Sequence, residues 1–256
     1  MPKLDETFTL RGKEVRSAWE EDFQALHVEE NFAGVLQAAV GADVRLRASY
    51  GYAQRRYKIK NTFFTAFNLG SGRDFFAEAA LRRLAERGAI DGSQINPEAD
   101  ASEVLEELTG KRTWRVVSEE VLVPAELSQT AYYYLDQLPA RAASGYTFTN
   151  AGAAVENVYA ILKAGLEPQL FSTVHDLHRF WLTLQDGKFL SADGTAALLA
   201  RYAAQEGWYE ICGTAPGARF MLAAHPGSRA LLVLLSNGEE GVESVYRQLL
   251  QAQGGV

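Results

Sequence analysis

Strand-like segments lie near both ends of the chain, and a helix-rich stretch separates them. Two segments, 32–39 and 43–52, read as strands joined by the turn signal Gly41-Ala42-Asp43. Turn residues also separate three later strands, expected at about 207–212, 218–224 and 229–236. Strands that meet through hairpins pair antiparallel, so the pattern predicts one mainly antiparallel sheet assembled from both ends of the chain.

Hydrophobic residues at helical spacing predict helices at both termini and through the middle of the chain. The expected helices span 12–30, 71–87, 102–109, 124–137, 151–164, 173–186 and 239–251, and 91–101 is expected to be a loop. The fold class is therefore α+β. We expect a helical region over 71–170, inserted between 1–70 and 171–256, which carry the strands of the sheet.

Composition excludes several classes of protein. The 256 residues include 25 Lys and Arg against 32 Asp and Glu, a net charge of −7, and 47% are hydrophobic, as in folded globular proteins. An acidic chain is a poor match for nucleic acid, which needs a basic surface. The single cysteine, Cys212, excludes an intrachain disulfide and a cysteine-based zinc cluster. The most basic stretch, 55–60, is interpreted as a solvated loop or edge strand.

The sequence carries no export or membrane signal. The N-terminus lacks a charged-then-apolar pattern, and the longest apolar run, 230–235, has the length of a strand rather than a membrane span. We therefore expect a cytoplasmic protein with no membrane or nucleic-acid partner, no cofactor and no metal. A small-molecule ligand is the expected partner, and the oligomeric state stays open.

Four segments resemble the motifs of one enzyme superfamily, and they occur in its order along the chain. They are Phe67-Asn68-Leu69-Gly70-Ser71, Tyr146-Thr147-Phe148-Thr149-Asn150, Ser172-Thr173-Val174-His175-Asp176-Leu177 and Ile211-Cys212-Gly213-Thr214-Ala215-Pro216-Gly217. Together they resemble the serine β-lactamase and penicillin-binding-protein superfamily, and especially its class C β-lactamase-like esterases and peptidases. The resemblance implies a β-lactamase/transpeptidase-like fold and a serine acyl hydrolase.

The resemblance also assigns roles, and this chain departs from most of them. The family uses a serine nucleophile, a lysine one helical turn later, a tyrosine that moves protons, and a cationic or hydroxyl-bearing strand. Here the nucleophile position is Ser71, and the former cleft positions are Asp74 for the lysine, Phe148 for the tyrosine, Asn150, Ile211 for the histidine or lysine, Cys212 and Gly213. An aspartate with a pKa near 4 is a poor base for a hydroxyl.

Other residues could in principle form a reactive or metal-binding site. Cys212 could act as a thiol nucleophile served by His175 or His178, and these histidines with Asp176 could hold a metal. A half-buried strand cysteine and a solvated helix start explain the same residues more simply. Lys58 and Lys60 precede Ser71, but no spacing rule places either of them on its hydroxyl.

The sequence therefore favours a degenerate member of the family that binds a small ligand in the former cleft. One alternative is an active, divergent serine hydrolase in which Ser71 uses a rearranged base, and another is an interaction module that uses a surface such as the tyrosine tract at 130–135. We expect the ligand to be neutral or cationic near Asp74 and to make apolar contacts with Ile211 and Phe148. We also expect the Ser71 hydroxyl to cap the helix that follows it.

Overall fold

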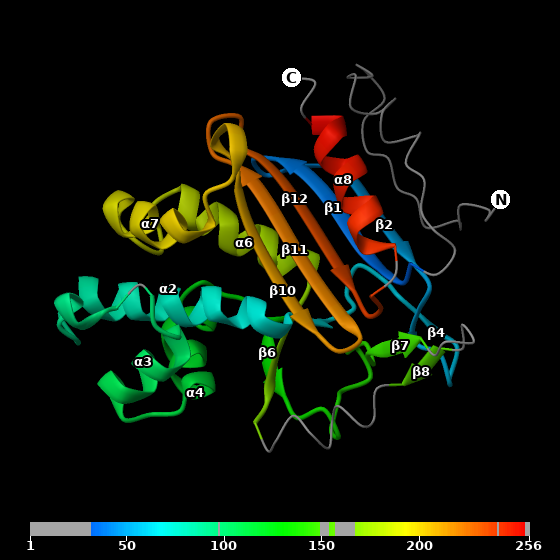
Figure 1. Ribbon diagram of the computed structural model, residues 1–256, viewed down its shortest axis with the longest axis horizontal. Helices are drawn as coiled ribbons and strands as arrows, with labels where there is room; N and C mark the ends of the chain where they lie inside the picture. Colours follow the sequence, from blue (N-terminus) through cyan, green and yellow to red (C-terminus); the bar gives the residue numbers. More distant parts are fainter. Residues whose placement is uncertain (1–31, 97, 149–153, 157–166, 240, 254–256) are drawn as a thin grey trace.

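A five-stranded antiparallel sheet forms the centre of the computed structural model, which describes residues 32–96, 98–148, 154–156, 167–239 and 241–253 (Figure 1). The strand order is β10-β11-β12-β1-β2. The bounds are β1 Gly34–Val40, β2 Asp43–Tyr50, β10 Tyr209–Ala215, β11 Ala218–His225 and β12 Ala230–Ser236. The five expected strands are confirmed within a few residues.

The pairing of β1 with β12 joins strands from the two ends of the chain into one sheet. Gly34 pairs with Ser236 and Val40 with Ala230, so the two strands match along their full lengths. Every residue of β12 is buried, because helices cover both faces of the sheet. A strand buried on both faces needs a continuous apolar run, which explains why 230–235 is the longest in the chain.

Each face of the sheet has its own hydrophobic core. On one face, helix α8 (Val242–Gln253) packs Val245 and Leu249 against Leu36 and Leu234. The opposite face is covered by α6 (Val174–Gln185) and by the start of α2 (Arg73–Glu86). Helix α2 meets the sheet near one end of β10 (Figure 1). This arrangement of helices on both faces of an antiparallel sheet is the expected α+β class.

The helices that follow α2 are short. They are α3 Ala101–Thr109, α4 Thr113–Val117 and a π-helical turn Ser118–Leu122, with α7 Ala192–Leu199 later in the chain. Asp100 caps the start of α3 through the N–H groups of Ser102 and Glu103, and Gly110 ends it with φ +65°. Single 3₁₀ turns occur at 70–72, 92–94, 200–202 and 205–207. The division of the chain at residues 70 and 170 stays a prediction.

Three small sheets connect these layers. One has the order β5-β9-β6, with β5 Phe67–Asn68, β6 Ala131–Tyr133 and β9 Gln169–Ser172. The others are the hairpin of β3 Tyr52–Gln54 with β4 Ile59–Lys60, and the pair of β7 Tyr146–Phe148 with β8 Ala154–Glu156.

The structure corrects two of the expected helices. The helix expected at 124–137 is wrong, because 131–133 form β6 and pair with β9, a conformation that suits aromatic residues. Within the expected helix 151–164, residues 154–156 form β8, and the rest lies outside the described residues. The expected helix 12–30 also lies outside them. No helix in the described part of the chain combines the length and apolarity needed to cross a bilayer.

Candidate active site

A glycine-rich turn, Gly70–Gly72, leads from β5 into α2 and packs against β10. Gly70 has φ +55°, and a side chain there would also collide with the carbonyl group of Thr214. From the other side, a side chain on Gly213 would collide with the carbonyl oxygen of Leu69. Glycine on both sides therefore allows the two backbones to approach each other closely at this point.

Ser71 lies in the middle of this turn, and it is exposed. The backbone N–H of Thr214 donates a hydrogen bond of 3.1 Å to Ser71 Oγ. Within the described residues, no side-chain base accepts a hydrogen bond from this hydroxyl. The expected capping role is wrong: neither the turn nor α2 starts with a side-chain cap, because the Ser71 oxygen bonds to β10 instead.

Asp74 lies in the first turn of α2, three residues after Ser71. Its Oδ1 atom is buried without a hydrogen-bond partner among the described residues, and Arg73 Nε lies 3.8 Å from it. Burial raises the pKa of the Asp74 carboxyl and the charge of Asp100 adds to the rise, against the attraction of Arg73 and Arg201. Asp74 is thus an incompletely neutralised carboxyl group, and it makes no hydrogen bond to Ser71.

Strand β6 brings Tyr132 into the same neighbourhood. Tyr132 pairs with Leu170, whose carbonyl accepts the N–H of Leu69 at 2.9 Å, two residues before Ser71. The Tyr132 hydroxyl is buried, and no hydrogen-bond partner lies within the described chain. Burial raises its pKa, and the charges of Arg73 and Asp74 also act on it. The sequence predicts a helix over 124–137 and therefore does not place Tyr132 at the site. Three consecutive tyrosines, which favour strands, are the signal that could have indicated β6.

Strand β10 separates the residues of the last motif onto two faces. Ile211 is 1% exposed and packs in the core beneath α2 and α6, so its side chain offers almost no surface to a ligand. Cys212 pairs with Met221, which belongs to the core beneath α8, on the opposite face. The residue is exposed, so the expected half-buried position is wrong, yet partial desolvation of the sulfur and the charges of Glu210 and Glu243 raise the pKa of the Cys212 thiol to about 11, so the thiol stays protonated at neutral pH.

The Tyr-x-Asn segment is only partly described. Phe148 ends strand β7, whose pairing with β8 places Phe148 opposite Ala154. Asn150 lies outside the described residues. The roles of these two positions therefore stay predictions.

A cavity of about 50 Å³ lies next to the Ser71 turn. Asn68 lines it, and Asn68 Oδ1 accepts the N–H of Gly70 at 2.8 Å, so one wall is continuous with the turn. Asn237 lines another side and donates through Nδ2 to the carbonyl of Ser144 at 2.9 Å. The remaining lining is mostly apolar and is formed by Leu135, Leu138, Ala143, Ser144, Gly145, Glu156, Phe171, Pro216, Gly217 and Ala218.

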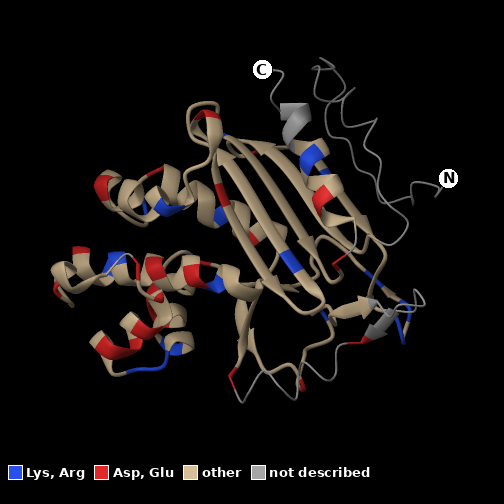
Figure 2. Ribbon diagram, viewed as in Figure 1, with Lys and Arg blue, Asp and Glu red and all other residues tan. Residues whose placement is uncertain are grey.

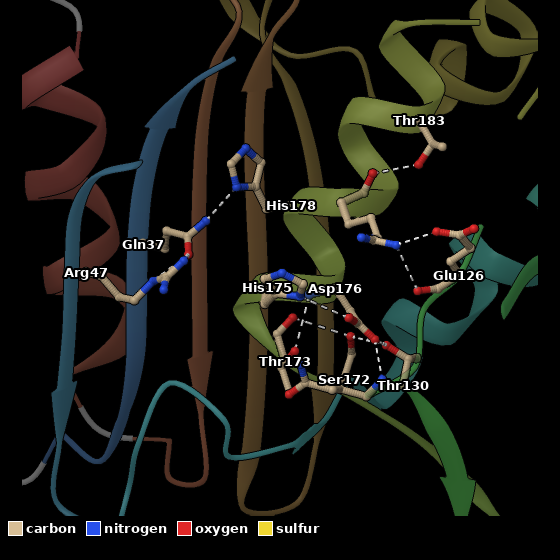
Figure 3. A network of polar contacts seen from close by, with 12 residues as sticks. Gln37, Arg47, Glu126, Thr130, Ser172, Thr173, His175, Asp176, His178 and Thr183 are labelled. Atoms are coloured by element: carbon tan, nitrogen blue, oxygen red, sulfur yellow. Dashed lines mark hydrogen bonds and ion pairs between the residues drawn. The ribbon is translucent and has the colours of Figure 1, made fainter. Parts of the chain in front are cut away.

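The two histidines of α6 have different surroundings (Figure 3). His178 is buried, and its Nδ1 lies 3.0 Å from Gln37 Nε2 while its Nε2 lies 2.7 Å from the carbonyl oxygen of Gly41. Arg47 donates to Gln37 Oε1, which leaves the Gln37 amide to donate to Nδ1 and assigns the proton to Nε2. Burial lowers the pKa of His178, so the neutral ring is a structural link between α6 and β1.

Asp176 also has a structural role. It is buried, and its Oδ2 accepts hydrogen bonds from Thr130 Oγ1 at 2.8 Å and from the backbone N–H of Gln129 at 2.7 Å (Figure 3). These bonds tie the start of β6 to α6. In the part of the chain that the structure describes, no group of three or more His, Cys, Asp or Glu side chains is arranged to hold a metal.

Comparison with solved structures finds the same architecture in penicillin-binding proteins and an amidase. A penicillin-binding protein from Bacillus halodurans matches with a TM-score of 0.74 and 17% identity, covering 93% of this chain and 99% of the other. FmtA from Staphylococcus aureus gives 0.72 and 18%, covering 92% and 89%. The D-amino acid amidase from Ochrobactrum anthropi SV3 complexed with D-phenylalanine gives 0.72 and 15%, covering 93% and 99%. At these identities the similarity shows the fold.

Sequence comparison supplies the family. The search of curated proteins finds no match. The family model described as Beta-lactamase matches residues 101–255, which is more than half of the chain, although the matched range starts after Ser71. The matched range, the shared fold and the meeting of the Ser71 turn with β10 agree: the chain belongs to the β-lactamase family.

Proposed function

We propose that this protein binds a small ligand beside Ser71 without hydrolysing it. The hydrogen bond from the Thr214 N–H to Ser71 Oγ carries the proposal. A backbone N–H gives a hydrogen bond to the hydroxyl oxygen and cannot remove its proton, whereas acyl transfer needs a base that can. In the described part of the chain, the hydroxyl has no hydrogen bond to such a base.

The same N–H supports a role in binding. Backbone donors at the edge of a strand can hydrogen-bond a carbonyl oxygen, which is how acyl-transfer sites hold their substrates. A ligand carbonyl could replace Ser71 Oγ as the acceptor of the Thr214 N–H, because the serine is exposed. Recognition of a carbonyl compound can therefore persist where activation of the serine has been lost.

Asp74 defines the expected charge of the ligand. The positive charges of Arg73 and Arg201 do not fully balance the charge of its carboxyl group. Its side chain is 40% exposed, so a charged group on a ligand can interact with it. Two unit charges at 4 Å interact by on the order of 4 kcal/mol at an effective dielectric constant of 20, and by less where water reaches them. An anionic group near Asp74 is therefore disfavoured, and a neutral or cationic group is favoured. Phe148 stays the proposed apolar contact, whereas the burial of Ile211 removes it from that role.

A matched series of phenylalanine derivatives tests this proposal, and the amidase complexes motivate the choice of scaffold. Phenylalanine amide is cationic, N-acetylphenylalanine amide is neutral and N-acetylphenylalanine is anionic, and each is used as both enantiomers. Binding is measured by thermal shift and titration calorimetry, with product formation followed by chromatography. The amide or its acetylated form should raise the melting temperature without being hydrolysed.

The variant Asp74→Asn should reduce the preference for the cationic compound, while Asp193→Asn, at an exposed aspartate on α7, should leave it unchanged. Stronger stabilisation by the anionic compound in the wild type would contradict the proposed ligand charge. Turnover of any compound that is lost in Ser71→Ala would contradict the proposed lack of hydrolysis and would support the divergent hydrolase.

A further inference from the structure

Positive charge is concentrated in one segment of this acidic protein. Residues 44–72 contain six Arg and Lys and no Asp or Glu, whereas 73–128 contain 12 acidic and 7 basic residues. Figure 2 shows the result: acidic residues are frequent along the helices α2, α3 and α4, while basic residues lie near β4 at the opposite end of the molecule. The net charge of −7 conceals this separation.

The basic segment also carries exposed apolar side chains. Tyr57 is 67% exposed and Phe64 69%, and Ile59 and Tyr52 are 40% and 38% exposed. Seven large hydrophobic side chains are exposed within the described residues, and four of the seven lie in this segment. A single exposed apolar residue is ordinary, but a cluster of them beside cations indicates a contact surface.

The hairpin of β3 and β4, which carries Tyr52, Tyr57 and Ile59, has a fixed base. Tyr52 pairs with Lys60, and Asn61 donates through Nδ2 to the carbonyl of Tyr50 at 2.9 Å. The N–H of Arg55 donates to the Tyr146 hydroxyl at 2.7 Å, and the Arg55 guanidinium lies over the Tyr146 ring. Hydrogen bonds to Tyr50 at the end of β2 and to Tyr146 of β7 therefore hold the hairpin in place.

The tip of the hairpin faces solvent. Arg56, Tyr57, Lys58, Ile59 and Lys60 are all exposed. Lys58 makes the turn with φ +53°, and its N–H bonds to the carbonyl of Arg55 at 3.2 Å. Cationic and apolar side chains therefore alternate along a short, projecting segment.

We propose that this hairpin docks the protein onto the surface of an anionic lipid bilayer. Lysine and arginine side chains are attracted to anionic headgroups, while tyrosine and isoleucine partition into the interfacial region. The acidic helices at the far end would then be repelled, which orients the molecule with the hairpin toward the lipid. The expectation of no membrane partner follows from the lack of a spanning segment, and peripheral docking requires no span.

Aliphatic Ile59 favours lipid over nucleic acid as the partner. Nucleic acid uses aromatic rings for stacking and cations for phosphates, and an exposed isoleucine adds neither. The net negative charge would also oppose a long polyanion that extends beyond the hairpin, whereas a docked bilayer touches only the projecting tip.

Vesicle co-sedimentation of the full chain tests the proposal. The probes are phosphatidylcholine vesicles with and without 30 mol% phosphatidylglycerol, at low and at near-physiological salt. We expect binding to the anionic vesicles that weakens with salt. The double variant Arg56→Glu/Lys58→Glu should reduce the partition coefficient by at least about 25-fold, from about fivefold for each charge lost. Tyr57→Ser/Ile59→Ser should reduce it by about tenfold or more.

Two controls match these changes elsewhere on the surface. Lys111→Glu/Arg115→Glu reverses two exposed charges near α4, and Val123→Ser removes a side chain that is 74% exposed. Both should stay within twofold of the wild type, and melting curves should show all variants folded. Equal binding to both vesicle types, or binding that the hairpin variants leave unchanged, would overturn the proposal. So would hairpin-dependent binding to a single-stranded oligonucleotide without binding to vesicles.

Discussion

The backbone N–H of Thr214 donates a 3.1 Å hydrogen bond to the side-chain oxygen of Ser71, which joins the edge of β10 to the turn before α2. The bond fixes where the hydroxyl points and supplies a donor to its oxygen. It supplies no acceptor for the hydroxyl proton. The proposed lack of hydrolysis rests on this contact, because no side-chain base among the described residues hydrogen-bonds to the hydroxyl.

Replacing Gly213 by alanine should disrupt this junction. The new methyl group would collide with the Leu69 carbonyl and the backbone of Gly72, so β10 and the turn must separate. Overpacking of this kind costs about 1–3 kcal/mol of unfolding free energy, measured by urea denaturation. Gly92→Ala is the control, because a methyl group there meets Ala85 Cβ at an ordinary 3.4 Å. Equal effects of the two substitutions would show that the backbones are not in close contact.

Replacing Asp74 by asparagine should stabilise the protein at neutral pH. Because burial and Asp100 raise the folded-state pKa of Asp74, the folded protein favours the protonated carboxyl. That contribution is complete below the unfolded pKa near 3.8 and is lost as the pH rises through the folded pKa. The variant's gain should therefore be present at pH 7 and absent at pH 3, and below about 1 kcal/mol because the group is partly exposed. A variant less stable than the wild type at pH 7 would contradict this account.

His178 should make stability fall on mild acidification. Burial lowers its folded-state pKa below 6.5, so its contribution is complete above pH 6.5 and is lost as the pH falls toward the folded value. Protonation would place an N–H at Nδ1 against the amide of Gln37. His178→Leu should cost about 1–3 kcal/mol at pH 7.5 and flatten the dependence between pH 7.5 and 5. His175→Gln replaces an exposed ring whose Nδ1 lies 3.3 Å from Asp176 Oδ1, and this variant should keep the pH dependence. An unchanged slope in His178→Leu would contradict the assignment.

The sequence predicted the main sheet well because its signals are local. The hairpins at Gly41 and at 226–227 join strands that pair with their neighbours in the chain, and the amphipathic face of α6 identifies that helix. Strand β6 has a local signal, its three consecutive tyrosines, but that signal does not identify the strand with which it pairs. Its pairing with β9 joins Tyr132 to Leu170, a contact between distant segments with no local signature.

The candidate site was predicted in part. The motif resemblance located Ser71 and Gly213, and the structure brings their two segments together. The resemblance could not show that Ile211 faces the core while Cys212 faces the other side of the sheet, because that depends on the register of β10. It also could not indicate the Thr214 N–H as the partner of Ser71, since a backbone donor leaves no trace in residue identity.

Restoring a lysine should recover little activity. Under the proposed assignment, Asp74→Lys returns one member of a catalytic unit whose other members are replaced at Phe148 and Ile211, and members of such units are strongly non-additive. The turnover of a chromogenic cephalosporin and of a phenyl ester should stay within about tenfold of the wild type. The double variant Asp74→Lys/Ser71→Ala separates background hydrolysis from any gain. A thousandfold rise in the single variant would show that the positions of Phe148 and Ile211 do not limit catalysis.

The most direct test of the central claim is intact-protein mass spectrometry after incubation with a fluorophosphonate and, separately, with a fluorescent penicillin. A nucleophilic serine forms a stable covalent adduct with the first reagent and an acyl-enzyme with the second. The account predicts that the wild type remains unmodified to the same extent as Ser71→Ala over hours at neutral pH. A stoichiometric adduct on the wild type that is absent from Ser71→Ala would contradict it and would establish Ser71 as an activated nucleophile.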